Sequence, residues 1–185
     1  MGKDCSIFSL FGHSSIAADP KSASFSVDVS ADYLFGAPAA GLEMTALAKI
    51  QKQTHPYVNW ENFSFGLQEE PFNPIDVDVE FENDAFLDAL GKEKLSGIIK
   101  KYPDVTVPLQ LDITTSVFEL GGRPRTKRIA LPLNNLEIAI GIKPRFENDR
   151  VASDSHAVFD IVALDRSGKR YYDLRFTDSH ICIHT

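Results

Sequence analysis

Apolar and polar residues alternate along the first strongly patterned stretch of the chain. From residue 25 to residue 31, Phe, Val and Ala side chains are separated by serine and aspartate, and this period of two predicts a strand with one buried face. Residues 36–41 follow, with a glycine at each end and Pro38 between them, which predicts a rigid corner. The alternation resumes over residues 42–50. Two long strands around a tight corner predict a β-sandwich.

Three later stretches carry the same strand pattern. Residues 75–81 alternate between large apolar side chains and carboxylates, and residues 108–118 alternate between aliphatic and polar side chains. Residues 128–133 form the expected partner of the latter strand, across a hairpin turn at Gly121-Gly122-Arg123-Pro124. The chain is therefore predicted to form several antiparallel strands.

Helical spacing is confined to residues 83–101. Its apolar residues predict one short helix over Asp84–Leu90, with Asn83 or Asp84 as the N-cap. Two glycines interrupt the pattern, so that a strand is predicted over residues 94–101. The fold class is thus all-β, an immunoglobulin- or fibronectin III-like antiparallel sandwich with a short helical elaboration.

A domain boundary is predicted near residues 132–136. Beyond it, residues 137–144 and 156–164 read as two new strands, with a turn at Asn148-Asp149 between them. Two or three strands cannot close a sandwich that normally has about seven. We therefore expect an incomplete second β domain over residues 134–170, after a sandwich domain over residues 22–133.

The two ends of the chain fit neither domain. Residues 1–21 are predicted to be disordered or unmatched, and the alternative is a degraded secretory signal, because the apolar run Ile7–Phe11 is too short for an intact one. Residues 171–185 form an unmatched tail. Its ending places His180, Cys182 and His184 on one side of a strand, which raises a metal site as a minor alternative to a frayed or frame-shifted end.

Composition narrows the function classes. The chain has 185 residues, 43% of them hydrophobic and 24% charged, as in an ordinary globular protein. Its formal charge of −7 argues against a nucleic-acid-binding surface. No apolar run approaches the roughly 18–20 residues of a membrane-spanning helix. Two isolated cysteines, Cys5 and Cys182, define neither a disulfide framework nor a redox compartment.

Two charged clusters are candidate binding sites. Asp76, Asp78 and Glu80 suggest calcium, but carboxylates two residues apart on a strand are about 6.6 Å from each other, so a solvated acidic face on an edge strand is the better interpretation. The basic cluster of residues 123–128 could bind an anion or an acidic partner, and a solvated hairpin tip is the favoured alternative.

An aromatic cluster over residues 51–67 is the third candidate. Tyr57, Trp60, Phe63 and Phe65 could form an exposed platform for a glycan or peptide, but such rings more often cap the end of a sandwich core. Motifs of hydrolases, phosphate-binding loops and zinc sites are not found in the sequence, so an enzyme, a cofactor and a catalytic residue are not expected.

The segment Asp32-Tyr33-Leu34-Phe35-Gly36-Ala37-Pro38-Ala39-Ala40-Gly41-Leu42 resembles a Tyr-Leu-aromatic-Gly-Ala-Pro-Ala segment of bacterial α2-macroglobulin-like proteins. Residues 116–132 resemble the end of the same macroglobulin domain. Residues 140–144 and 159–165 resemble the opening of the next macroglobulin domain. In that family a strand also follows a short Asp-x-x-Gly-Lys turn, and Gly91-Lys92 stands at that position. The resemblance covers about residues 25–169.

This resemblance implies a structural, non-catalytic segment of a very large periplasmic protease trap. Its expected partners are neighbouring macroglobulin domains, and target proteases would be met only through the full-length protein. The Cys-x-Glu-Gln thioester motif is matched by neither cysteine, and no bait region can be placed. The alternative is an independent secreted immunoglobulin-like binding module that uses Trp60, in which case Trp60 should be exposed.

Overall fold

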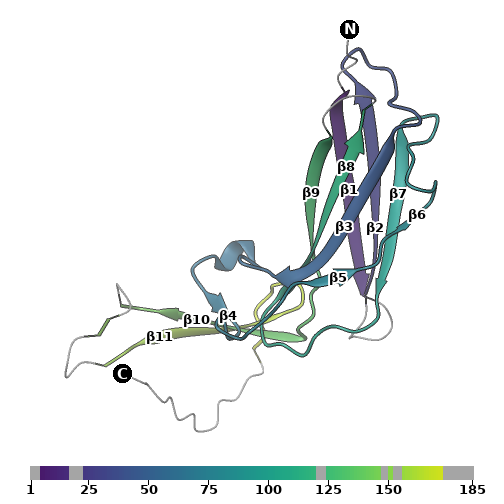
Figure 1. The fold of residues 1–185 in the computed structure, drawn as a ribbon. Helices are drawn as coiled ribbons and strands as arrows, with labels where there is room; N and C mark the ends of the chain where they lie inside the picture. Colours follow the sequence, from purple (N-terminus) through teal and green to yellow (C-terminus); the bar gives the residue numbers. More distant parts are fainter. Residues whose placement is uncertain (1–4, 17–22, 120–123, 147–149, 152–155, 173–185) are drawn as a thin grey trace.

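The computed structural model describes residues 5–16, 23–119, 124–146, 150–151 and 156–172. Over these residues the chain forms antiparallel strands in three sheets and one short 3-10 helix, η1 (Val58–Trp60). Two of the sheets pack face to face as a sandwich, and the third projects from one end of it (Figure 1). The all-β prediction is confirmed.

The two sheets of the sandwich have four strands each. The first has the order β1-β2-β7-β6, formed by Cys5–Ile16, Ala23–Tyr33, Lys92–Ile99 and Glu80–Phe81. The second has the order β5-β3-β8-β9, formed by Ile75–Val77, Glu43–Lys52, Leu109–Phe118 and Arg125–Pro132. All pairings between neighbouring strands are antiparallel.

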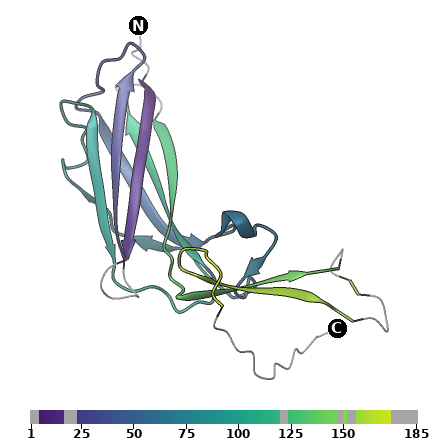
Figure 2. The same ribbon diagram turned by 180° about the vertical axis from the view of Figure 1, so that it is seen from behind.

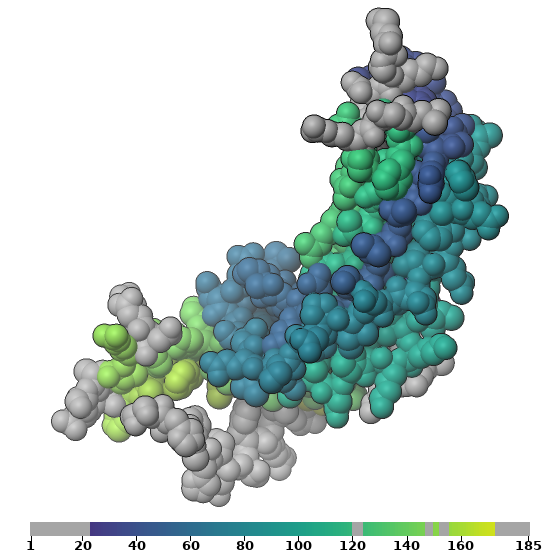
Figure 3. All heavy atoms as spheres, in the orientation of Figure 1, coloured from purple at the N-terminus to yellow at the C-terminus, as the bar shows by residue number. Residues whose placement is uncertain are grey.

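The third sheet combines one early and two late segments of the chain. Its order is β11-β10-β4, formed by Phe159–Asp165, Ile138–Pro144 and Ser64–Phe65. Seen from both sides, β10 and β11 extend away from the end of the sandwich as an arm (Figures 1 and 2). The space-filling view shows residues near 60 and 70 in the corner between this arm and the sandwich (Figure 3).

The alternation in the sequence fixes the faces of the sandwich as predicted. Along β2, Phe25, Val27 and Val29 are buried and the residues between them are more exposed. Strands β3 and β8 likewise bury every second side chain, and these side chains fill one continuous core between the two sheets. The predicted corner lies between β2 and β3, where Gly36 and Gly41 have positive φ angles of 84° and 71°.

The prediction of disorder at the N-terminus is wrong for Cys5–Ile16. This segment forms β1 and pairs with β2 along its length, from Cys5 opposite Tyr33 to Ile16 opposite Ala23. Backbone hydrogen bonds to an existing strand can order a segment whose side chains show little alternation. Cys5 therefore lies at one end of the first sheet.

The predicted helix over Asp84–Leu90 is also wrong. Asp84 and Ala85 have φ angles of 52° and 67°, which belong to the left-handed region and are incompatible with an α-helix. Asp88 then forms a turn, because its carboxylate accepts hydrogen bonds from the backbone N–H groups of Leu90 and Lys92, both at 2.8 Å. The turn leads into β7, whose prediction from the sequence is confirmed.

The predicted strand over residues 75–81 is divided between the two sheets. β5 pairs with β3 in one sheet, and β6 pairs with β7 in the other. The chain crosses from sheet to sheet at residues 78–79, so both pieces are edge strands. Asp76, Asp78 and Glu80 are all exposed, which agrees with an acidic face that protects sheet edges.

Candidate functional site

The aromatic segment after β3 leaves the sandwich and joins the third sheet. Its strand β4 pairs with β10, with Phe65 opposite Gly141 and Ser64 opposite Ile142. The N–H of Gly66 donates to the carbonyl of Ile140 at 3.3 Å. Residues 57–65, which we call the aromatic segment, therefore belong structurally to the arm and not to the sandwich that precedes it in the chain.

The rings of this segment build a second hydrophobic core. Its buried centre consists of Phe65, Ala139, Val162 and Leu164, and the partly buried side chains around it are Tyr57, Trp60, Phe63 and Leu136. Tyr57 meets Phe65 edge to face with ring centroids 4.8 Å apart, and Trp60 meets Phe63 in the same way at 5.4 Å. The rings do cap a core as predicted, but it is the core of the third sheet.

Trp60 also makes polar contacts to the turn after β11. Its indole N–H donates to the carbonyl of Gly168 at 3.3 Å, across 108 positions of sequence. The guanidinium of Arg170 lies over the indole ring, 4.9 Å from its centroid. Trp60 is therefore half-buried and engaged on its face and its N–H, which is not the geometry of a free aromatic platform.

The turn at residues 165–169 is shaped by one carboxylate. Asp165 accepts hydrogen bonds from the Ser167 hydroxyl at 2.6 Å and from the backbone N–H groups of Ser167 and Lys169 at 2.9 and 3.0 Å. These bonds hold the pKa of Asp165 below its usual value, and the largest contribution comes from the Ser167 hydroxyl. Burial, and then the nearby Asp165 charge, raise the pKa of Tyr57.

The linker between β9 and β10 is tied to the sandwich. The side-chain oxygen of Asn135 accepts from the Leu109 N–H at 2.8 Å, and its amide donates to the Val107 carbonyl at 3.1 Å. The Tyr102 hydroxyl donates to the Leu133 carbonyl at 3.0 Å. The arm is thus attached at two places, through this linker and through the aromatic segment.

The other face of the arm is apolar and uncovered in the described part of the chain. Antiparallel pairing places Ile142 opposite Ile161, and Ile140 lies next to them on the same face. These three side chains are 45%, 51% and 45% exposed, in contrast to the buried residues on the face beneath Phe65. Adjacent exposed isoleucines on one sheet face are typical of a surface that another element covers.

Comparison with known families decides the identity of the sandwich. The profile described as Bacterial Alpha-2-macroglobulin MG5 domain matches residues 14–134, from the end of β1 to the start of the linker. The chain belongs to the bacterial α2-macroglobulin family. Residues 57–65, the aromatic segment, lie within the span of this match.

Relatives and solved structures agree with this assignment. The α2-macroglobulins of two strains of Xylella fastidiosa are 29% identical to this chain over 153 residues, which is 80% of the chain and 9% of theirs. A mutant of Salmonella α2-macroglobulin superposes with a TM-score of 0.67 at 26% identity, over 92% of this chain and 12% of its own. Escherichia coli α2-macroglobulin activated by porcine elastase superposes with a TM-score of 0.63 at 26% identity, over 89% of this chain and 14% of its own. The chain therefore spans only a small share of the proteins it matches.

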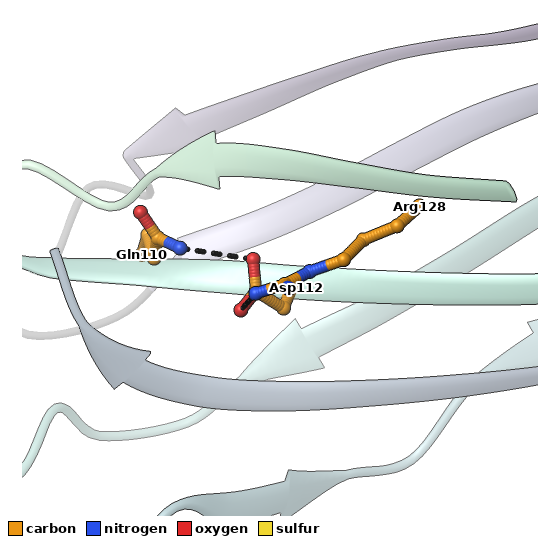
Figure 4. A network of polar contacts seen from close by, with 3 residues as sticks. All are labelled: Gln110, Asp112 and Arg128. Atoms are coloured by element: carbon orange, nitrogen blue, oxygen red, sulfur yellow. Dashed lines mark hydrogen bonds and ion pairs between the residues drawn. The ribbon is translucent and has the colours of Figure 1, made fainter. Parts of the chain in front are cut away.

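The predicted basic cluster does not form one site in this macroglobulin domain. Arg128 lies opposite Thr114 on the outer face of β9, whereas Lys127 lies opposite the buried Thr115 and so points to the other side. Arg128 is paired with the carboxylate of Asp112, which also accepts from the Gln110 amide at 2.9 Å (Figure 4). Arg123 lies outside the described residues.

Two buried carboxylates escaped the sequence analysis. Asp112 is 4% exposed although it faces outward, because the surrounding side chains of the macroglobulin sheet cover it. Glu93, also buried, accepts hydrogen bonds from the backbone N–H groups of Glu82, Asn83 and Lys94 at 3.0, 3.1 and 2.7 Å. The period-2 pattern marks Glu93 as inward-facing, and a charged residue at such a position was the available signal.

The remaining candidates give no site in the described residues. No group of three or more His, Cys, Asp or Glu side chains that could hold a metal occurs among them, and none of their helices is long and apolar enough to cross a membrane. Asp76 pairs with Lys49 at 3.1 Å in solvent. The tail residues His180, Cys182 and His184 lie outside the described residues, so the metal alternative stays a prediction.

Proposed function

We propose that this chain is a non-catalytic packing module of an α2-macroglobulin-like inhibitor of endopeptidases. The observation that carries the proposal is the family match over residues 14–134, which spans most of the sandwich. The predicted domain of residues 22–133, extended by β1, would act as one macroglobulin domain, and residues 134–170 would be the start of the next. The chemistry of protease capture would lie elsewhere in the full-length protein.

The mechanism available to such a module is mechanical. Its sandwich is held by a continuous core, and a packed core transmits displacement instead of absorbing it. The exposed isoleucine face of the arm, formed by Ile140, Ile142 and Ile161, offers a surface for a neighbouring part of the same large protein. The module would hold its neighbours in register until cleavage of a bait region elsewhere releases them.

Two finer parts of the proposal come from the family. We infer that the parent protein works in the periplasm, where it would meet foreign proteases. We also infer that neither Cys5 nor Cys182 forms a thioester, since neither stands in a Cys-x-Glu-Gln sequence. Neighbouring macroglobulin domains would be the direct partners of this chain, and proteases would be indirect ones.

A chimera tests the proposal. Residues 5–170, which include β1, would replace the corresponding segment of Escherichia coli α2-macroglobulin, a protein with solved structures in elastase- and trypsin-activated forms. We expect the chimera to trap trypsin, and the isolated chain neither to inhibit trypsin nor to cleave casein. Stoichiometric inhibition or substrate turnover by the isolated chain would contradict the proposal.

A matched pair of variants makes this experiment specific to the arm. Ile161→Glu places a charge on the exposed isoleucine face and should reduce trapping by the chimera. Ile98→Glu changes an exposed isoleucine on the outer face of β7 and should not. Equal effects of the two variants would show that the face of the arm has no special part in packing.

A further inference from the structure

The arm of the molecule is a hairpin whose buried face is filled by residues from another part of the chain. β10 and β11 supply only Ala139, Val162 and Leu164 to the buried centre of the second core. The large side chain at that centre, Phe65, comes from the aromatic segment, as do Tyr57, Trp60 and Phe63 around it. The aromatic rings that cover this face therefore come from residues 57–65 and not from β10 or β11.

The hairpin has little else to hold it in the described structure. An isolated two-stranded hairpin is at best marginally stable in water, and three strands or a packed cover are needed for independent stability. β4 is the third strand and the aromatic rings are the cover, and both come from residues 57–65. The linker contributes one side chain, Leu136, to the same cluster.

The sandwich does not depend on the aromatic segment in the same way. Its core residues form a separate cluster, to which none of the four rings belongs. The segment is anchored to the sandwich through its flanks, where the N–H of Leu67 donates to the Thr106 hydroxyl at 3.0 Å. The Lys52 ammonium also donates to the carbonyls of Gln68 and Glu70, at 2.7 and 2.6 Å.

We propose that residues 57–65 are a donated segment, through which the first domain folds and orients the β10–β11 hairpin of the second. Loss of the donated rings releases the hairpin while the sandwich stays folded. The covalent linker at residues 133–137 keeps the two parts connected but does not order the hairpin alone. The two cores then unfold as separate units, the arm before the sandwich.

Hydrogen exchange on the full chain tests this directly. In Phe65→Ala, the amides of β10 and β11 should exchange at least ~100-fold faster, since truncating a fully buried phenylalanine removes most of the second core. The amides of β3 and β8 should keep their rates. The matched control is Phe72→Ala, which removes a phenylalanine packed against the sandwich core and should act on β3 and β8 instead.

A milder variant covers the case in which Phe65→Ala does not fold. Trp60→Ala removes a half-buried ring together with its bond to Gly168 and its contact with Arg170, and should accelerate exchange in β11 about 10-fold. Phe35→Ala, which removes an exposed ring stacked on Tyr33, should leave the arm unchanged. Unchanged exchange in β10–β11, or equal acceleration in the arm and the sandwich, would overturn the proposal.

Discussion

The ring of Phe65 occupies the space that a side chain at Gly141 would need. The two residues face each other across the β4–β10 pair, and a Cβ atom at Gly141 would lie 2.5 Å from Cε1 of Phe65. The sandwich contains the same arrangement, in which Phe25 covers Gly97 across the β2–β7 pair at the same distance. An aromatic ring laid over a cross-strand glycine fills the gap left by the missing side chain. Both cores of the molecule use this pairing.

We therefore predict that Gly141→Ala destabilises the arm. The new methyl group must displace the Phe65 ring, and overpacking of this kind costs about 1–3 kcal/mol. Urea unfolding followed by the fluorescence of Trp60, the single tryptophan of the chain, measures the effect. The far-UV circular dichroism is dominated by the long strands of the sandwich, so its urea transition should differ little between Gly141→Ala and the wild type.

A double variant checks the cause. In Gly141→Ala with Phe65→Leu, the smaller side chain leaves room for the methyl group, so the two substitutions together should cost less than the sum of their separate effects. Strict additivity would mean that the ring does not limit the space at Gly141. Gly97→Ala should act on the sandwich transition instead, through Phe25.

Arg128→Ala should destabilise the sandwich by about 1–3 kcal/mol, because it leaves the buried Asp112 carboxylate with the Gln110 amide as its remaining partner. The Arg128 side chain is itself 59% exposed, so the lower half of this range is expected. The matched control is Lys127→Ala, which removes an exposed cation on the other face of β9 and should cost at most about 0.5 kcal/mol. Thermal unfolding compares the two variants, and equal costs would show that burial of Asp112 is irrelevant.

Glu93→Ala should destabilise the first sheet at the end of β6. The substitution removes the acceptor of the backbone N–H groups of Glu82 and Asn83, and hydrogen bonds to a charged group are worth about 1.5–3 kcal/mol each. Both donor residues are exposed, so the lower end of this range is expected. Glu93→Gln keeps one acceptor oxygen and should cost less. Hydrogen exchange at Asn83 and urea unfolding measure both, with the exposed Glu80→Ala as the control. A loss no greater than that of Glu80→Ala would contradict the structural role of Glu93.

Acid should loosen the arm. Because hydrogen bonds depress the pKa of Asp165 in the folded state, this carboxylate stabilises the fold fully above its unfolded pKa of about 3.9, and the contribution is lost as pH falls through the lower folded value. The Asp160 carboxylate acts in the same direction, since the hydrogen bond from Arg145 lowers its pKa. Trp60 emission followed from pH 7 to pH 2 should therefore change at the acid end.

Two variants separate this turn from general acid unfolding. Ser167→Ala removes the strongest hydrogen bond to Asp165 and should shift the acid transition to higher pH. Asp165→Asn should weaken the pH dependence of Trp60 emission at the acid end. Asp76→Asn, on a sandwich edge strand, should leave this pH dependence as in the wild type. A transition that Asp165→Asn does not alter would rule out this carboxylate as its origin.

The strands of the sandwich could be predicted because each carries its own evidence. In β2, β3 and β8 every second side chain is apolar, and each strand buries that face whatever its neighbour in the sheet is. The turn before β7 was expected only from the family resemblance, at Gly91-Lys92, and the Asp88 carboxylate forms it by accepting from N–H groups two and four residues ahead. These are short-range relationships along the chain.

The failed predictions concern segments whose structure depends on distant partners. β1 is ordered by hydrogen bonds to β2, and the side-chain pattern of β1 does not predict this pairing. Helical spacing over Asp84–Leu90 gave way to pairing of this stretch with β3, where the N–H of Met44 donates to the carbonyl of Ala85 at 2.9 Å. Local propensity decides little where such a contact is available.

The sequence by itself determined an all-β chain, the inward faces of its main strands, and a resemblance to the macroglobulin domains of bacterial protease inhibitors. Only the tertiary structure decided that Phe65 and its neighbouring rings serve the β10–β11 hairpin instead of the sandwich that precedes them. Alternation specifies that a side chain is buried, because the two faces of a strand have different environments. It does not specify which core receives that side chain, because this depends on where a distant glycine, Gly141, leaves space for a ring.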